Sequence, residues 1–245
     1  MFFLMFIFAA TRGSGDADYY NYLWFAKDIG TDFSNVMNFS YPVEFSFRLA
    51  SYLINLIGLS RQWVIVLMNF LSIGPVTYVA IKKSVNPFLS AIIFLPIFLQ
   101  FDMQTSRTAT AIGLGLLSIY LASEKKRIKS LFVLVLAVSF HKSAVVLIPF
   151  LIYLEIDLSN LVKCVIVLAS LVVSVFSKVV FAIAASIFSK IGLGILSRKI
   201  ITYTFEGKFA YGMKLFDPRI IFFLLLFIVS IMYLDKTTFQ GDRMD

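Results

Sequence analysis

The sequence is poor in charge, cysteine and histidine, and each scarcity excludes a class of protein. Charged residues make up 15% of the 245 residues, whereas a soluble domain typically carries about 25%. The single cysteine, Cys164, excludes an intramolecular disulfide. One cysteine and one histidine also argue against a metal cluster. The low charge therefore excludes a soluble domain.

Several familiar catalytic motifs are also absent. The sequence has no Walker loop, no His-Glu-x-x-His zinc motif and no Gly-x-Ser-x-Gly elbow. It has no motif typical of proteins that bind nucleic acid. No charged residue lies in the middle of a clear apolar span, as a proton relay or a voltage sensor requires.

What the sequence has in abundance is apolar residues in long runs. Hydrophobic residues make up 60% of the chain, Phe occurs 27 times, and the mean hydropathy is +0.89. A helix needs about 17–25 apolar residues to cross a bilayer, and several runs approach or reach that length. We therefore expect one all-α domain over residues 1–245, a polytopic transmembrane bundle of about seven or eight full or partial spans.

The runs predict where these spans lie. The first, over residues 1–11, is too short to cross, so we expect a half-inserted helix or a start further upstream. Residues 130–154 form one run, broken at residues 141–143 into two half-spans. The other expected spans are residues 62–81, 87–101, 108–123, 160–179 and 219–234.

Two segments between the spans are mixed in character. Residues 12–61 are expected to form a loop region with two amphipathic helices, at residues 16–29 and 44–59. Tyr and Trp gather in the first of them, as they do at membrane interfaces. Residues 180–218 are expected to form a large loop that holds several basic residues.

Lysine and arginine in short loops predict the orientation. The net charge is +8, and the strongest basic clusters are Lys82 with Lys83 and residues 125–129. Such clusters mark cytoplasmic loops. Two spans separate them, so both fall on one side. Arg107, His141 and residues 180–218 then fall on the outer face. Residues 12–61 fall there as well, provided that residues 44–59 do not cross the membrane. The residue types able to do chemistry thus gather on one side of the membrane.

Arg107 and His141 are the leading candidates for function, and each also has a structural interpretation. Arg107 begins the helix expected at residues 108–123, where it can clamp a phosphate or anchor a helix end. His141 interrupts an apolar run. Imidazole accepts protons near neutral pH, but a packed histidine can also simply bond a carbonyl at a helix end.

Acidic residues and tyrosines near the N-terminus form a second group of candidates. Asp16 and Asp18 can orient or deprotonate a hydroxyl, although Asp16 or Ser14 can also cap the following helix. Glu44 and Arg48 are one helical turn apart, so they can pair with each other. The Tyr and Trp side chains suit either a sugar face or the membrane interface.

Four short motifs occur in a recognisable order: Arg12 before Asp16-Ala-Asp18-Tyr19, then residues 41–47 (YPVEFSF), then Arg107 to Ala111 (RTATA), then Phe140 to Ala144 (FHKSA). Over roughly residues 9–235 the chain resembles the EpsG-like family of bacterial polysaccharide polymerases, relatives in function of the Wzy O-antigen polymerases. The resemblance implies a GT-C-like membrane glycosyltransferase. Family members usually begin with a full span and continue past the large loop, so we expect a frame truncated at both ends.

The resemblance implies a specific reaction at the outer face of the bacterial inner membrane. A glycan on undecaprenyl pyrophosphate is transferred to a sugar hydroxyl of another lipid-linked repeat unit, as in exopolysaccharide, capsule or O-antigen synthesis. Neither a cofactor nor an obligatory metal is expected. Besides the lipid-linked oligosaccharide and membrane lipid, a flippase and a chain-length regulator of the same pathway are expected partners; nucleic acid is not.

The chemistry assigns roles to the candidates. Cations should stabilise the departing pyrophosphate, and a base should take the hydroxyl proton. His141 is the first base, with Asp18 or Glu44 as competitors. The pyrophosphate-binding candidates are Arg107, Arg12, Arg198 and Lys199, and the sugar-binding candidates are Asp16, Tyr19 and Tyr203.

Other functions stay open at this point. A lipid-linked glycan ligase or another membrane glycosyltransferase would use the same parts with a different acceptor. A transporter or flippase would need polar groups at the bilayer midplane and often repeat symmetry, and neither is visible. An assembly subunit would not depend on Arg107 or His141. A membrane acyltransferase is a more distant alternative.

Overall fold

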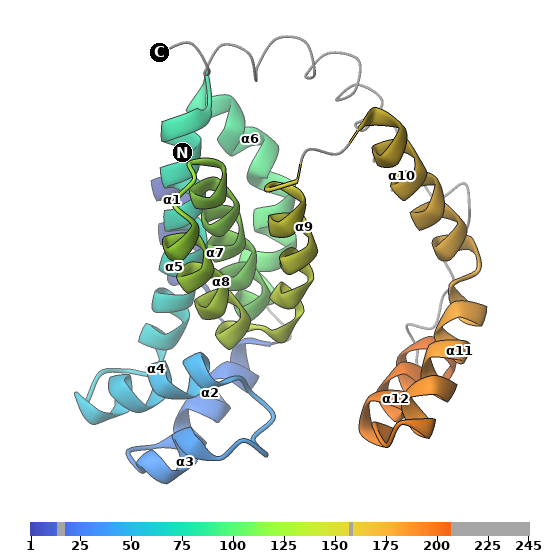
Figure 1. Cartoon of the computed structure of the whole chain (residues 1–245). Coiled ribbons are helices and arrows are strands. Elements are labelled where there is room, and N and C mark those ends of the chain that lie inside the picture. Colours follow the sequence, from blue (N-terminus) through green and yellow to red (C-terminus); the bar gives the residue numbers. More distant parts are fainter. Residues whose placement is uncertain (14–17, 157–158, 207–245) are drawn as a thin grey trace. The chain divides into compact units, whose positions relative to one another are not determined.

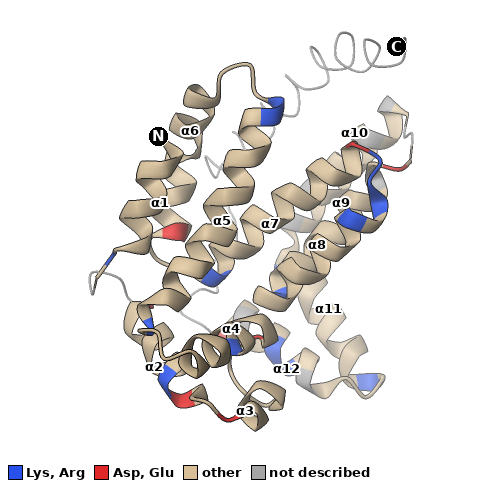
Figure 2. Cartoon of the chain, turned by 90° about the vertical axis from the view of Figure 1, so that its left-hand side faces the viewer, with Lys and Arg blue, Asp and Glu red and all other residues tan. Residues whose placement is uncertain are grey.

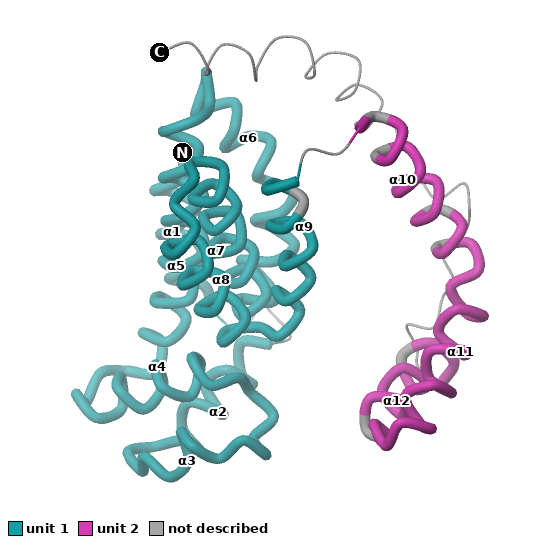
Figure 3. Tube along the Cα trace, in the orientation of Figure 1, with its two compact units in different colours: residues 1–157 teal, residues 158–245 magenta. Residues whose placement is uncertain are grey.

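A computed structural model describes residues 1–13, 18–156 and 159–206 of the chain. Within these ranges all regular structure is helical, which confirms the expected all-α class. The chain divides into two compact units, Met1–Asp157 and Leu158–Asp245 (Figure 3). Each unit is described by itself.

The first unit is a bundle with a cap of short helices at one end (Figure 1). The bundle contains α1 (Phe2–Ala10), α5 (Gln62–Lys83), α6 (Pro87–Ile97), α7 (Ser106–Ser123), α8 (Arg127–Phe140) and α9 (Leu147–Tyr153). The end cap contains α2 (Tyr19–Ile29), α3 (Phe33–Met37) and α4 (Phe45–Leu56). The helices expected near residues 1–11, 16–29 and 44–59 are therefore present.

Helix α7 is the central element, and small residues let its neighbours approach closely. A Cβ added at Gly113 would lie only 2.3 Å from the carbonyl oxygen of Ser72 on α5. On another part of α7, the hydroxyl of Ser118 donates to the carbonyl of Ser130 on α8 over 2.9 Å. Small and hydroxylated residues at helix contacts are typical of membrane bundles, where backbones pack closely.

Two interruptions in the helices position the candidate site. Pro96 lacks an N–H, and the chain then continues as a π-helical turn, η1 (Phe98–Asp102), before a short turn leads into α7. The second interruption comes at His141, whose extended backbone ends α8. The chain continues as a 3₁₀ turn, η2 (Lys142–Val146), and then α9, so the expected break at residues 141–143 is confirmed.

The described part of the first unit has one helix long and apolar enough to cross a membrane and exposes many large apolar side chains. Helix α5 is long and apolar enough to cross a bilayer, and it is the one helix to pass that test within the described residues. Two shorter apolar segments, Pro87–Asp102 and Lys142–Ile152, accompany it. Large apolar side chains are exposed along the bundle, including Phe3, Leu4 and Phe132. The other expected spans, and the total of seven or eight, stay predictions.

Charged residues gather at the ends of the bundle helices, and their middle stretches are almost free of charge (Figure 2). Lys83, the last residue of α5, pairs with Glu124, which follows α7, over 2.6 Å. This ion pair places the two basic loops at the same end of the bundle, as the count of spans predicts. A second ion pair joins Arg127, the first residue of α8, to Glu155, which follows α9.

The described part of the second unit is built of helices joined by short turns. Helices α10 (Asn160–Val175) and α11 (Ser177–Lys190) follow each other with a break at Phe176. Helix α12 (Gly194–Ile201) and a π-helical turn, η3 (Thr202–Glu206), continue the chain. Residues 180–206 of the large loop expected at residues 180–218 are therefore mostly helical, and their place outside the membrane stays a prediction. The span expected at residues 219–234 lies outside the described residues.

The contact at Gly113 gives a testable prediction about the bundle. Gly113→Ala should destabilise the protein by about 3 kcal/mol, because the added methyl group meets backbone atoms of α5 that cannot move aside. Gly74→Ala is the matched control, because nothing lies within 4 Å of a Cβ at Gly74 and alanine favours a helix. Thermal unfolding of the detergent-solubilised protein measures both. Equal midpoints for the two variants would show that α5 and α7 do not pack as described.

Candidate active site

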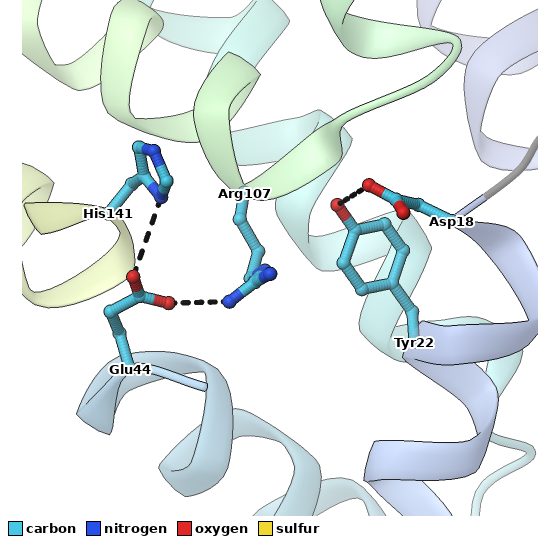
Figure 4. Close-up of polar contacts among 5 residues, drawn as sticks. All are labelled: Asp18, Tyr22, Glu44, Arg107 and His141. Atoms are coloured by element: carbon cyan, nitrogen blue, oxygen red, sulfur yellow. Dashed lines mark hydrogen bonds and ion pairs between the residues drawn. The ribbon is translucent and has the colours of Figure 1, made fainter. Parts of the chain in front are cut away.

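Three charged or titratable side chains meet where the end cap joins the bundle (Figure 4). Arg107 Nη1 donates a hydrogen bond to Glu44 Oε2 over 2.6 Å. His141 Nδ1 lies 3.5 Å from the other oxygen, Glu44 Oε1. One carboxylate thus faces a guanidinium and an imidazole. The structure brings together three of the four residues that the sequence proposes as catalytic.

Each of the three residues lies at the end of a different helix. Glu44 occupies the N-cap position of α4, Arg107 is the second residue of α7, and His141 follows the last residue of α8. The hydroxyls of Ser46 and Ser139 bond over 2.5 Å and hold α4 against α8. A helix N-terminus carries partial positive charge, so the start of α7 together with Arg107 makes a region that favours an anion.

The electrostatic state of Glu44 follows from these contacts. Burial alone would raise the pKa of Glu44, but the His141 side chain and the charge of Arg107 outweigh it and hold that pKa at about 2. Glu44 is therefore ionised at neutral pH. A carboxylate with so low a pKa is a weak base and is suited to hold the two groups that it faces. The role of Glu44 as a competing base stays a prediction.

Arg107 keeps donor capacity beyond its bond to Glu44. Its Nε is buried and has no hydrogen-bond partner among the described residues. The guanidinium carbon lies 5.7 Å from the centre of the Tyr22 ring, in a cation–π contact. The ring and Glu44 fix the guanidinium from two sides, and the remaining N–H groups are the donors that a phosphate oxygen would need.

Tyr22 connects Arg107 to Asp18. The Tyr22 hydroxyl donates to Asp18 Oδ2 over 3.4 Å (Figure 4). Burial raises the pKa of Tyr22, and the nearby Arg107 opposes that shift. Asp18 occupies the N-cap position of α2, with no hydrogen bond from its side chain to the helix backbone. The role of Asp18 as a competing base stays a prediction.

Arg12 holds the segment that leads into Arg107. Its guanidinium donates to the carbonyl of Asp102 at the end of η1. It also donates to the hydroxyl of Ser106 at the start of α7, over 2.6 Å. Arg12 is 7% exposed. These contacts suit a residue that positions the start of α7, and binding of pyrophosphate by Arg12 stays a prediction.

An apolar groove of about 300 Å³ begins beside the charged residues. Thr108, which follows Arg107, and Ser143, which follows His141 by two residues, line it. It continues along α7 past Ile112 and Ile119, with Leu147 of α9 on the other side. An apolar groove therefore lies next to the positively charged Arg107.

The remaining candidates are distributed over the chain. Asp16 lies outside the described residues. Tyr19 donates to Gln62 Oε1 over 2.8 Å. Arg198 and Lys199 are exposed residues of α12, and Tyr203 belongs to η3; all three lie in the second unit, and their parts in a site stay predictions. Within the described residues no group of His, Cys, Asp and Glu could hold a metal ion.

The structure also corrects one pairing and adds one residue. Glu44 faces Arg107 and His141, whereas Arg48 donates to the carbonyl of Asn38 and covers the Phe39 ring. The pairing of Glu44 with Arg48 that their spacing suggests is therefore replaced by contacts between distant segments. Sequence reasoning missed Tyr22 as a site residue. Tyr22 lies three residues after Tyr19 and four residues before Ala26. This spacing places the three on one face of a helix, but it does not predict which part of the protein that face contacts.

Comparison with known protein families gives a match over nearly the whole chain. The family described as the EpsG family matches residues 1–242. This match confirms the resemblance that the four motifs carry. No curated protein and no solved structure matches the chain.

The contacts of Glu44 predict a pH-dependent contribution to stability. The pKa of Glu44 is lowered from 4.5 to about 2 in the folded protein, so its stabilisation is complete above pH 4.5 and is lost as the pH falls towards 2. Glu44→Gln should lower the free energy of unfolding at pH 7 by roughly 2 kcal/mol. Unfolding of the solubilised protein across this pH range measures the difference, which should shrink below pH 4.5.

Glu155→Gln is the matched control for this prediction. Glu155 also pairs with an arginine, but Arg127 is 71% exposed at its side chain, and exposed ion pairs contribute little. We expect that variant to differ little from the unmodified protein at any pH. A Glu44→Gln variant that unfolds like the control would contradict the described contacts of Glu44.

Proposed function

Since the chain belongs to the EpsG family, whose members are membrane proteins of polysaccharide biosynthesis, we propose that it is a polysaccharide polymerase. The proposed substrates are two lipid-linked saccharides. A glycan attached to undecaprenyl pyrophosphate is transferred to a sugar hydroxyl of another lipid-linked repeat unit, at the outer face of the bacterial inner membrane.

The observation that carries the proposal is the arrangement around Arg107. The leaving group of this reaction is a lipid pyrophosphate, which gains negative charge as the glycosidic bond breaks. A guanidinium fixed by Glu44 and Tyr22 at the start of a helix is preorganised to stabilise that charge. It needs little rearrangement during the reaction, which is the condition for effective electrostatic catalysis.

His141 supplies the complementary function of a base. A carboxylate opposite Nδ1 favours the tautomer with a proton on that nitrogen, which leaves Nε2 to accept a proton. The acceptor hydroxyl oxygen forms a bond to the anomeric carbon of the donor glycan. The bond from that carbon to the pyrophosphate oxygen breaks, the lipid pyrophosphate departs with the electron pair, and the hydroxyl proton passes to Nε2.

The apolar groove supports the lipid-linked nature of the donor. It begins at Thr108, immediately after Arg107, and runs along α7 among aliphatic side chains. A polyprenyl chain in this groove would bring its pyrophosphate to the guanidinium. The basic loops joined by Lys83 and Glu124 would then face the cytoplasm and leave the site at the outer face.

The first functional prediction concerns Arg107 and His141. In a strain that lacks its own polymerase and makes the matching lipid-linked repeat, the gene should restore a ladder of surface glycan on a gel. We expect Arg107→Ala to lower the rate of polymerisation about 10²–10³-fold, because it removes the charge opposite the leaving group. His141→Ala should lower it by about 10²-fold or more, through loss of the base. Both ladders should collapse towards single repeats.

Arg127→Ala is the matched control, since it removes an arginine from the exposed pair with Glu155. It should leave the ladder intact at an equal amount of membrane protein. A full ladder from both Arg107→Ala and His141→Ala would sink the site assignment. Transfer of single glycans to a different acceptor, without a ladder, would indicate a ligase.

The groove gives a separate prediction about the lipid. Ile112→Trp should fill part of the groove and raise the apparent KM for the lipid-linked repeat by roughly tenfold, because the polyprenyl chain loses apolar contacts. Leu131→Trp, at a position of α8 that is 60% exposed, is the size-matched control and should leave KM unchanged. Initial rates in membrane vesicles measure both. The same KM for the two variants would place the lipid elsewhere.

A further inference from the structure

A second pocket, of about 560 Å³, lies beside α2 in the first unit. Its lining includes Tyr19, Tyr20, Trp24 and Lys27 of α2 and Arg61 and Gln62 at the start of α5. The face of α2 that carries Tyr22 is buried against the active site, whereas Tyr20, Trp24 and Lys27 are exposed. One helix therefore serves the active site with one face and this pocket with another.

The aromatic side chains of the pocket present ring surfaces to solvent. Tyr20 is 63% exposed and Trp24 is 58% exposed. Tyr19 and Tyr20 pack edge to face, with ring centres 5.5 Å apart, and Trp24 contacts Phe25 in the same manner over 5.2 Å. These contacts restrict the rings while leaving surface open. The C–H groups of a sugar ring pack favourably against the negative face of such an aromatic ring.

Two cations share the pocket with these rings. Lys27 and Arg61 are both exposed, and neither has an acidic partner within ion-pair distance among the described residues. The combination of rings and cations matches a ligand with both a saccharide and a phosphate group.

The floor of the pocket is tied to the bundle by a chain of hydrogen bonds. The Tyr19 hydroxyl donates to Gln62 Oε1 over 2.8 Å. Gln62 Nε2 in turn donates to the carbonyl of Ala10 over 2.8 Å and to that of Arg12 over 3.2 Å. The pocket is therefore braced against the segment that also positions Arg107, which lowers the cost of ordering it when a ligand binds.

We propose that this pocket binds the saccharide and diphosphate of the acceptor, the lipid-linked unit whose hydroxyl attacks. The inference rests on the proposed function, because a polymerase must hold two lipid-linked saccharides at once. Arg107 serves the departing pyrophosphate of the donor. The acceptor keeps its own diphosphate, which needs a second set of cations, and Lys27 and Arg61 provide one.

A binding experiment tests the pocket without relying on activity. The sequence has two tryptophans, so Trp63→Phe leaves Trp24 as the single tryptophan reporter. The full chain carrying Trp63→Phe is placed in phosphatidylcholine nanodiscs and titrated with the lipid-linked repeat extracted from a polymerase-deficient strain. We expect saturable change in Trp24 fluorescence. Adding Lys27→Gln and Arg61→Gln to this variant should weaken binding about tenfold or more.

Kinetics provide the second measurement, with matched controls. Trp24→Ala should raise the apparent KM for the lipid-linked repeat about tenfold and change kcat little, because the ring holds the acceptor and does not react. Trp63→Ala is the control, since Trp63 is 49% exposed but does not line the pocket. Lys129→Gln, in the first turn of α8, is the control for charge. Both controls should retain the original KM.

The outcomes separate the pocket from the proposed function. A glycan ladder from the unmodified chain without a Trp24 signal, or with unchanged KM in the pocket variants, overturns the pocket alone. A saturable Trp24 signal without any ladder supports the pocket and overturns the polymerase. Equal competition by phosphatidylglycerol would show a general site for anionic lipid headgroups and overturn the assignment to the acceptor.

Discussion

The candidate site depends on one partly buried carboxylate. Glu44 is held between Arg107 and His141, and it joins the start of α4 to the start of α7 and the end of α8. An ionised carboxylate in a mostly apolar protein is stable only while its charge is compensated. Arg107 needs Glu44 for the same reason, and the other carboxylate oxygen faces Nδ1 of His141. Each of the three side chains therefore fixes the others, and together they hold the end cap on the bundle.

Close packing in the bundle determines where Arg107 lies. Gly113 allows α7 to approach α5 at Ser72, and Arg12 fastens the turn before α7 through Ser106. These contacts lie in the first turns of α7. They fix the start of the helix, and with it the position of the Arg107 side chain. The π-helical turn that ends at Asp102 contributes as well, because it redirects the chain out of α6. Apolar packing thus supplies the precision that an electrostatic site requires.

For the first unit, the sequence predicts where the helices lie better than it predicts which residues of different helices meet. Apolar runs mark helices directly, and the polar residues after Phe140 mark the break between α8 and η2. The motifs identify Arg107 and His141 as candidates. The contact of both with Glu44 depends on how three helices meet, which no local pattern encodes. The sequence favours a loop over residues 180–218 because basic residues are scattered through them, yet Lys190 lies at the end of α11, where charge is compatible with a helix.

In the proposed reaction, the cation of the active site and the two cations of the second pocket have different roles. Lys27 and Arg61 lack acidic partners among the described residues, so they can attract a diphosphate in the ground state. Arg107 is paired with Glu44, which lowers the net charge around it. Tight binding of the lipid pyrophosphate before and after reaction would not accelerate the transfer and would slow release of the product. A paired arginine gains most from the extra charge that develops as the bond breaks. The acidic partner of Arg107 therefore favours turnover, and the unpaired cations beside α2 favour capture of the next unit.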